Sequence, residues 1–237
     1  KSVPLQWKKS SSQTILDRGW GGFSALAWWF GKNLREELNI PIGIVLAAYG
    51  GASIHPFILP TSPLKGISKK TKKEMTGYVQ EYNLAEKKFK EKLASLPGEQ
   101  IGEKEAGEKH TFSSFNEYNT LKIGSAWMAM LSPLGKMPAK GFTWYQGESD
   151  SAKPETYSDK MKLLRRQNKM FFSTKNFIFV QIAPWTYGQG EDLPKLWQAQ
   201  LNFAHKTGCP MVGSVDLGDM EDIHPVKKKE LADRMTK

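Results

Sequence analysis

Short hydrophobic runs divide the chain, and they lie at residues 40–48, 141–145, 176–183 and 211–216. The run at 40–48 is almost continuously apolar rather than alternating, which is typical of a strand buried on both faces of a parallel sheet. We interpret the other runs as further strands of that sheet, because each is short and followed by a turn or a polar loop. The sequence therefore predicts a mainly parallel sheet.

Amphipathic segments alternate with these runs, and their apolar residues recur every three or four positions, as on one face of a helix. They lie at residues 23–38, 71–96, 157–172 and 194–205. We expect a shorter helix at 125–131 and another that begins at Lys227. Alternating strands and helices are typical of α/β proteins. A chain of 237 residues with 39% hydrophobic content suits one large domain, residues 1–237, better than two small ones.

The formal net charge is +10, and many of the lysines lie in one segment. We expect residues 60–120 to form a helical insertion on the sheet, in which lysines alternate with glutamates. This pattern is typical of a solvated helix face with ion pairs four residues apart. Because no nucleic-acid-binding module is recognisable, the charge favours solubility over a nucleic-acid partner. A basic protein would also attract an acidic sugar over long range.

Composition excludes several other classes of function. No apolar run approaches the length of a membrane span, so we expect no membrane partner. The single cysteine, Cys209, excludes an intrachain disulfide and a cysteine-rich metal site. The four histidines show no metal-ligand spacing. We therefore predict neither a metal nor a cofactor.

Polar or glycine residues follow three of the predicted strands. Gly50 and Gly51 follow the first strand, Gln146, Glu148 and Asp150 follow the strand at 141–145, and a loop that runs from Asp216 to His224 follows the last strand. Parallel sheets gather the carboxyl ends of their strands at one edge, where ligands bind. We expect these segments to form one site.

The residue types at these strand ends suit acyl transfer. A histidine two residues after Asp222 suits a general base, because a carboxylate can orient the imidazole and stabilise its charged form. A free amide in the turn at Gly50 and Gly51, together with the side-chain amide of Gln146, would suit an oxyanion hole. Each feature also has a plainer interpretation: an exposed loop histidine, a simple turn, and a glutamine that satisfies a local backbone carbonyl.

The order and spacing of these motifs resemble the sialate O-acetylesterase domain family, a branch of the SGNH hydrolases that removes acetyl esters from carbohydrates. The matching blocks lie at residues 23–25, 30–31, 39–43, 50–51, 144–149, 180–184, 199–200, 216–219 and 222–225. Together they cover most of the chain. The resemblance implies a three-layer α/β/α sandwich of the flavodoxin-like type and an acetylated carbohydrate as substrate.

The resemblance also implies roles for individual residues. A serine near the end of the first strand of the family attacks the acetyl carbonyl, and His224 takes the place of the base. Asp222 is our choice for the carboxylate that orients it, with Glu221 and Asp219 as alternatives. The oxyanion donors carried over are the amide of Gly51, or else of Gly50, and the side chain of Gln146. Glu148 is expected to brace the loop.

The chain departs from the family at the nucleophile. The family carries its serine in a block well upstream of the helix at 23–38, and nothing before Ser24 matches that block. Ser24 is better explained as a helix cap, and Ser53 follows the oxyanion glycines. We therefore expect a fragment that lacks the N-terminal strand and is inactive alone. A second departure is Met128-Ala129, where the family commonly has Asn-Gly.

Two further expectations concern the parent protein. An acetylated glycan as substrate favours a periplasmic or secreted location, although these residues contain no recognisable secretion signal. The rival hypothesis is a carbohydrate-binding or scaffold protein that has kept the fold without catalysis. The sequence upstream of Lys1 would distinguish the two hypotheses.

Overall fold

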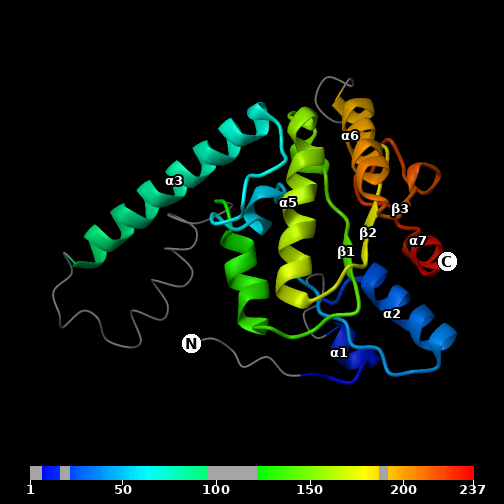
Figure 1. The fold of residues 1–237 in the computed structure, drawn as a ribbon. Helices are drawn as coiled ribbons and strands as arrows, with labels where there is room; N and C mark the ends of the chain where they lie inside the picture. Colours follow the sequence, from blue (N-terminus) through cyan, green and yellow to red (C-terminus); the bar gives the residue numbers. More distant parts are fainter. Residues whose placement is uncertain (1–6, 17–21, 95–121, 187–191) are drawn as a thin grey trace.

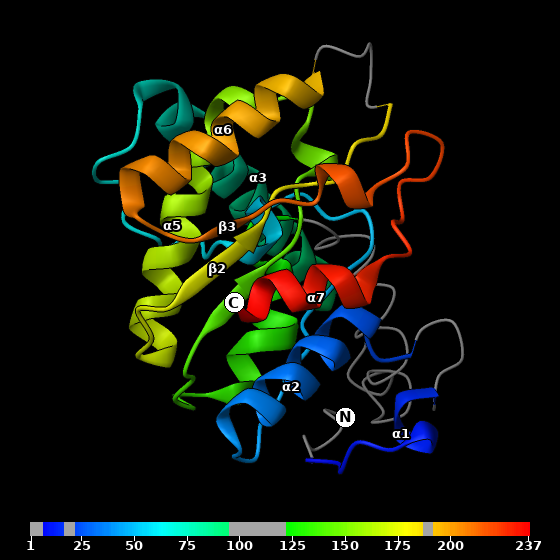
Figure 2. The ribbon, with the colours of Figure 1, turned by 90° about the vertical axis from the view of Figure 1, so that its right-hand side faces the viewer.

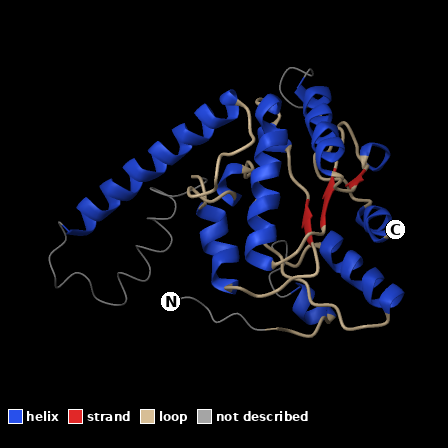
Figure 3. Cartoon of the chain, in the orientation of Figure 1, coloured by secondary structure: helices blue, strands red, loops and turns tan. Residues whose placement is uncertain are grey.

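The computed structural model describes residues 7–16, 22–94, 122–186 and 192–237. Its sheet has three strands, β1 (Phe142–Trp144), β2 (Phe177–Val180) and β3 (Met211–Val212). They pair in parallel in the order β1-β2-β3, with Phe142 opposite Phe177 and Phe179 opposite Met211. The strands are short, and helices and loops dominate (Figure 3). Three of the four predicted strands are thus confirmed, with narrower bounds.

Helices cover both faces of this sheet, as Figure 1 and Figure 2 show. On one side lie α5 (Pro154–Phe172) and α6 (Asp192–Thr207), and on the other lie α2 (Ala25–Leu38) and α7 (Lys228–Thr236). Successive residues of a strand point to opposite faces. Phe179 therefore packs on Phe203 of α6, with ring centroids 5.2 Å apart, while Val180 packs with Leu231 of α7. The predicted α/β fold with three layers is confirmed.

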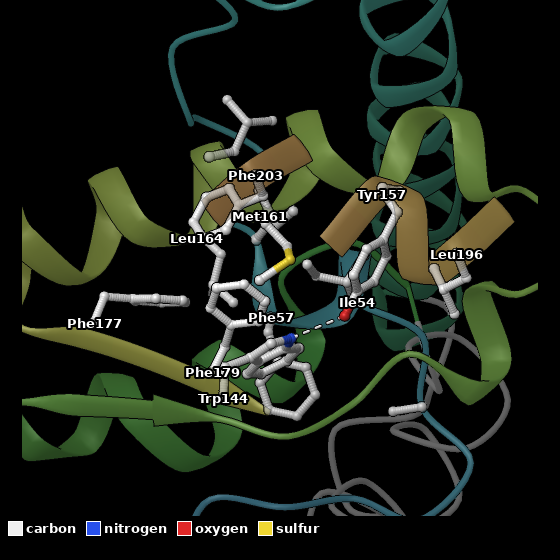
Figure 4. Packing of buried hydrophobic residues seen from close by; sticks show 14 of the residues in the cluster. Ile54, Phe57, Trp144, Tyr157, Met161, Leu164, Phe177, Phe179, Leu196 and Phe203 are labelled. Atoms are coloured by element: carbon white, nitrogen blue, oxygen red, sulfur yellow. Dashed lines mark hydrogen bonds between the residues drawn. The ribbon is translucent and has the colours of Figure 1, made fainter. Parts of the chain in front are cut away.

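The main hydrophobic core lies between the sheet, the α5 and α6 helices and the segment after the Gly-Gly turn. Figure 4 shows its large side chains, among them Ile54, Phe57, Trp144, Tyr157 and Leu196. Trp144 donates its indole N–H to the Tyr157 hydroxyl at 3.2 Å, so the one polar group of each ring has a partner. This packing fixes the end of β1 against α5, the helix that follows the loop after β1.

Ser24 caps the α2 helix, because its hydroxyl accepts a hydrogen bond from the Ala27 N–H at 3.3 Å. This confirms the prediction that Ser24 is a helix cap. We expect Ser24→Ala to lower the free energy of unfolding by about 1 kcal/mol, since the N–H of Ala27 loses its partner. Ser24→Asp, which keeps an acceptor at this position, should preserve stability. Urea unfolding of the three proteins measures the difference, and equal stabilities would contradict the assignment.

The prediction of a strand at residues 40–48 is wrong. This segment is a loop, and Ile40, Val45 and Leu46 are 52%, 41% and 42% exposed. Its contacts are with side chains rather than with a strand: Ile44 lies against Gly31 of α2, and the Trp7 ring lies against Gly43. A strand needs a neighbour to complete its hydrogen bonds. Within the described residues, β1 pairs only with β2, and no strand lies between β1 and this segment.

The helical insertion is confirmed in its first half. The α3 helix (Lys69–Ala94) has buried Thr71 and Met75 near its start and extends away from the body of the molecule (Figure 1). Exposed ion pairs four residues apart, Lys87 with Glu91 and Lys90 with Glu86, follow the predicted pattern. Residues 95–121, which include the second half of the predicted insertion, lie outside the described residues. None of the described helices combines the length and the apolar character needed to cross a membrane.

The remaining elements are short. They are α1 (Ser12–Leu16), the 3-10 helices η2 (His55–Phe57), η7 (Ser132–Leu134), η8 (Glu148–Asp150) and η9 (Val215–Leu217), and the π-helix η6 (Trp127–Leu131). The η6 helix occupies the place of the helix predicted at 125–131. Met128, at the second departure from the family, lies in it and is 54% exposed, so this side chain does not fill a gap in the core.

Candidate active site

The Gly-Gly segment forms a tight turn. The Ala52 N–H donates to the Tyr49 carbonyl at 3.2 Å, and Gly51 has φ +72°. This left-handed conformation explains why glycine occupies that position. Among the described residues beyond the immediate chain neighbours, no atom lies within 4 Å of where a Cβ of Gly50 or Gly51 would be. The turn is therefore not closely packed at these two positions.

Gln146, at the end of β1, ties this turn to the loop after the strand. Its side-chain N–H groups donate to the Ala52 carbonyl at 3.0 Å and to the Asp150 carboxylate at 2.9 Å. Its side-chain oxygen accepts from the Tyr157 hydroxyl at 3.1 Å. Both amide hydrogens are thus engaged within the protein, which matches the alternative of a glutamine that satisfies a local carbonyl. The oxyanion role of Gln146 stays a prediction.

The loop after β1 makes two further short contacts. The Glu148 carboxylate accepts from the Gly147 N–H at 2.8 Å, and the Ser149 hydroxyl donates to the Gly51 carbonyl at 2.8 Å. The first contact is the kind expected of a residue that braces the loop. The second is a direct link between two of the three predicted strand ends.

Asp150 contacts both the segment after the Gly-Gly turn and the end of β1, and it is 3% exposed. Its carboxylate accepts from the Ile54 N–H at 2.7 Å as well as from Gln146. Burial raises the pKa of this carboxyl above its ordinary value, while the nearby Lys160 ammonium acts in the opposite direction. The sequence placed Asp150 at the strand end, but it gave no sign of Lys160 as its partner.

The predicted base and acid lie in the loop after β3. The side chain of His224 is 80% exposed, and its Nδ1 is 3.7 Å from the nearest oxygen of Asp222. The same carboxylate accepts from the backbone N–H of His224 at 2.8 Å. Asp219 instead accepts from the backbone N–H of Glu221 at 2.9 Å. Of the three candidate acids, Asp222 is the one with a described contact to the His224 ring.

Lys228 connects this loop with the end of β1. Its Nζ lies 5.4 Å from the centre of the Tyr145 ring. Burial lowers the pKa of the Lys228 ammonium, while the Glu148 and Asp222 carboxylates raise it. Carboxylates of both loops therefore interact electrostatically with Lys228. Figure 2 shows the loop after β3 at the end of the sheet toward which the strands point. The sequence contained no signal for this lysine.

A serine and a histidine are in contact just after the Gly-Gly turn. The Ser53 hydroxyl is 2.9 Å from Nδ1 of His55, and the His55 ring stacks on Tyr78 of α3 with centroids 4.0 Å apart. The residues are two positions apart in sequence, so their contact is local. Within the described ranges, no three His, Cys, Asp or Glu side chains cluster closely enough to hold a metal ion.

Comparison with known proteins finds relatives in sequence. A sialate O-acetylesterase from Mus musculus is 24% identical over 258 residues, which cover 98% of this chain and 45% of the mouse protein. The chain is a relative of the sialate O-acetylesterases. The Homo sapiens sialate O-acetylesterase is 27% identical over 149 residues, which cover 63% of this chain and 21% of that protein. No family model matches the chain.

A solved structure shows the same fold. The crystal structure of a carbohydrate acetylesterase from Xanthomonas citri superposes with a TM-score of 0.61 over 91% of this chain, at 22% sequence identity. That match covers 40% of the bacterial enzyme. The chain therefore spans less than half the length of these sialate O-acetylesterase relatives and of this structural neighbour.

Proposed function

We propose that the protein to which this chain belongs is a carbohydrate O-acetylesterase that works through a serine and a histidine. The observation that carries the proposal is the meeting of two predicted strand ends, through Ser149 with Gly51 and Gln146 with Ala52. This meeting occurs in a chain related to sialate O-acetylesterases over nearly its whole length. The loop with His224 follows the third strand end.

In the proposed reaction, a serine oxygen attacks the acetyl carbonyl while His224 takes the proton of that serine. The resulting oxyanion is stabilised by the N–H of Gly51, whose turn is not closely packed at that position. The C–O bond to the sugar then breaks, and His224 returns the proton to the departing sugar oxygen. Water hydrolyses the acetyl-enzyme by the same steps and releases acetate. Asp222 orients His224 throughout.

The nucleophile is proposed to lie in a segment that precedes Lys1. Ser53 is the alternative within the described residues, because its hydroxyl contacts a histidine. However, this contact is to Nδ1 of a neighbour two residues away, and the ring of that histidine stacks on Tyr78. The local pair fits a role in the shape of the turn better than a role as nucleophile.

Ser53→Ala tests this choice directly. In the full gene product we expect kcat on an aryl acetate to stay within about threefold of the unchanged protein, since a locally bonded hydroxyl contributes little. Steady-state kinetics provides the measurement, with Ser62→Ala as a matched control, because Ser62 is a serine nine positions further along whose hydroxyl donates to Gln167. Loss of all turnover in Ser53→Ala alone would place the nucleophile inside this chain.

Two classes of substrate fit the proposal: acetylated sialic acid, and acetylated plant polysaccharides such as xylan. The net charge of +10 favours an acidic sugar through long-range attraction. Acetate release from acetylated sialic acid and from acetylated xylan, each at low and high salt, separates the two. Either substrate would favour a periplasmic or secreted location. A protein that binds these sugars but releases no acetate would instead match the non-catalytic rival.

A further inference from the structure

The helical insertion reaches the candidate site through a chain of buried charges. Lys160 on α5 has a side chain that is 1% exposed, and its ammonium lies 2.9 Å from the Glu74 carboxylate of α3 and 3.4 Å from that of Asp150. The Tyr78 hydroxyl also donates to Glu74, at 2.8 Å. One buried cation therefore joins a carboxylate of the insertion to a carboxylate under the site.

The position of Asp150 makes this pairing relevant to catalysis. Its carboxylate holds the Ile54 N–H and the side chain of Gln146, and Gln146 in turn holds the Ala52 carbonyl. Both contacts lie just after Gly51, the proposed oxyanion donor, on the side of the turn that leads into the core. Buried carboxylates keep their charge only when a cation or several donors compensate it. The Lys160 ammonium supplies that cation.

We propose that Lys160 is a positioning residue of the esterase site: it keeps Asp150 in place, and through Asp150 it fixes the turn that presents the Gly51 N–H. Glu74 holds the Lys160 ammonium from the other side, so the α3 helix also helps to position the site. The inference rests on the proposed function for its catalytic consequence, but its geometric part can be tested on this chain without any activity.

Removal of the cation should disturb the turn. In Lys160→Met, the carboxylates of Asp150 and Glu74 face each other without the ammonium between them, so one of them must protonate or turn away. Asp150 is the one expected to change, because its side chain is the more buried, at 3% exposed against 15% for Glu74. Its protonation or movement weakens the acceptor for the Ile54 N–H. The double variant Asp150→Asn with Lys160→Met removes both members of the pair, and the side-chain oxygen of asparagine can still accept from Ile54. The double variant should therefore restore the turn.

The geometric test uses amide hydrogen exchange measured by NMR on this chain. We expect the Ile54 N–H to exchange at least about tenfold faster in Lys160→Met and to recover in the double variant, because exchange reports local opening. Lys169→Met is the matched control, since Lys169 is an exposed lysine on the same helix. Unchanged Ile54 exchange in Lys160→Met would overturn the proposal. Should Lys160→Met not fold, the double variant must fold with Ile54 protected, and its failure would also overturn the proposal.

The catalytic test uses the full gene product and an aryl acetate. We expect Lys160→Met to lower kcat at least about tenfold with KM nearly unchanged, since small displacements of a catalytic group are costly, and the double variant to regain most of that loss. Normal kcat in a variant with fast Ile54 exchange would overturn the link to catalysis. If the protein has no His224-dependent activity at all, the proposed function fails. The exchange rate of Ile54 in Lys160→Met then still decides whether Lys160 positions the turn.

Discussion

Replacement of His224 by alanine is expected to lower kcat of the full gene product on an aryl acetate by at least about 1,000-fold, because the serine loses its general base and the sugar oxygen loses its proton donor. The side chain of His224 is 80% exposed. Its removal should therefore leave the free energy of unfolding nearly unchanged, so the loss can be assigned to chemistry rather than to folding. Steady-state kinetics and urea unfolding measure the two quantities.

His205→Ala is the matched control for this experiment, since His205 is an exposed histidine on α6, away from the three strand ends. It should retain the kcat of the unchanged protein. Asp222→Ala should give a smaller loss than His224→Ala, because its proposed role is to orient the base. Activity that survives His224→Ala would remove the base from the proposed mechanism, and with it the reason to group this loop with the other strand ends.

Gln146→Ala is expected to lower kcat by about 100-fold. The change removes the bonds to the Ala52 carbonyl and to Asp150, so the turn with Gly51 loses its tie to β1. It also leaves the buried Asp150 with one donor fewer, which should lower the free energy of unfolding by about 1 to 3 kcal/mol. Kinetics and urea unfolding of the same preparations measure both effects.

Two comparisons sharpen this prediction. Gln198→Ala is the control, because Gln198 is exposed and its side chain donates to Asn202 on the same helix. Gln146→Glu keeps an oxygen for the Tyr157 hydroxyl but places a second carboxylate beside Asp150, so it should be at least as damaging as Gln146→Ala. A loss of kcat below about threefold in Gln146→Ala, the range of an ordinary surface change, would show that neither the oxyanion role nor the tie to the turn matters.

The sequence predicted the sheet well where strands have neighbours. The runs at 141–145 and 176–183 contain β1 and β2, which pair with each other, and the run at 211–216 contains β3. The run at 40–48 is equally apolar, yet it forms a loop. Hydrophobicity reports whether a segment prefers to be buried, but a strand also requires a partner for its backbone groups. That requirement depends on the rest of the fold and is not visible in the segment itself.

The candidate site shows the same division. Gln146 could be predicted because it follows a strand, and ligand-facing groups of parallel sheets gather at strand ends. Gly51 meets the loop after β1 as expected, although the segment before it is a loop rather than a strand. The contacts of Lys160 could not be predicted, since it is one of several lysines on an amphipathic helix and its partners are 10 and 86 residues away in sequence. The sequence leaves two interpretations of Gln146 open, and its bonds to Ala52 and Asp150 match the plainer one, while the oxyanion role stays a prediction. Residue type indicated the chemistry but not the partners.

Trapping the acetyl-enzyme would show whether the proposed mechanism, with His224 as base, operates in this protein. The full gene product is mixed with an aryl acetate, stopped in acid within one turnover, and digested for mass spectrometry. We expect one acetyl group on a serine in a segment that precedes Lys1, formed in the unchanged protein and absent in His224→Ala. An acetylated residue within this chain, or an acetyl-enzyme that forms equally well without His224, would contradict this proposal.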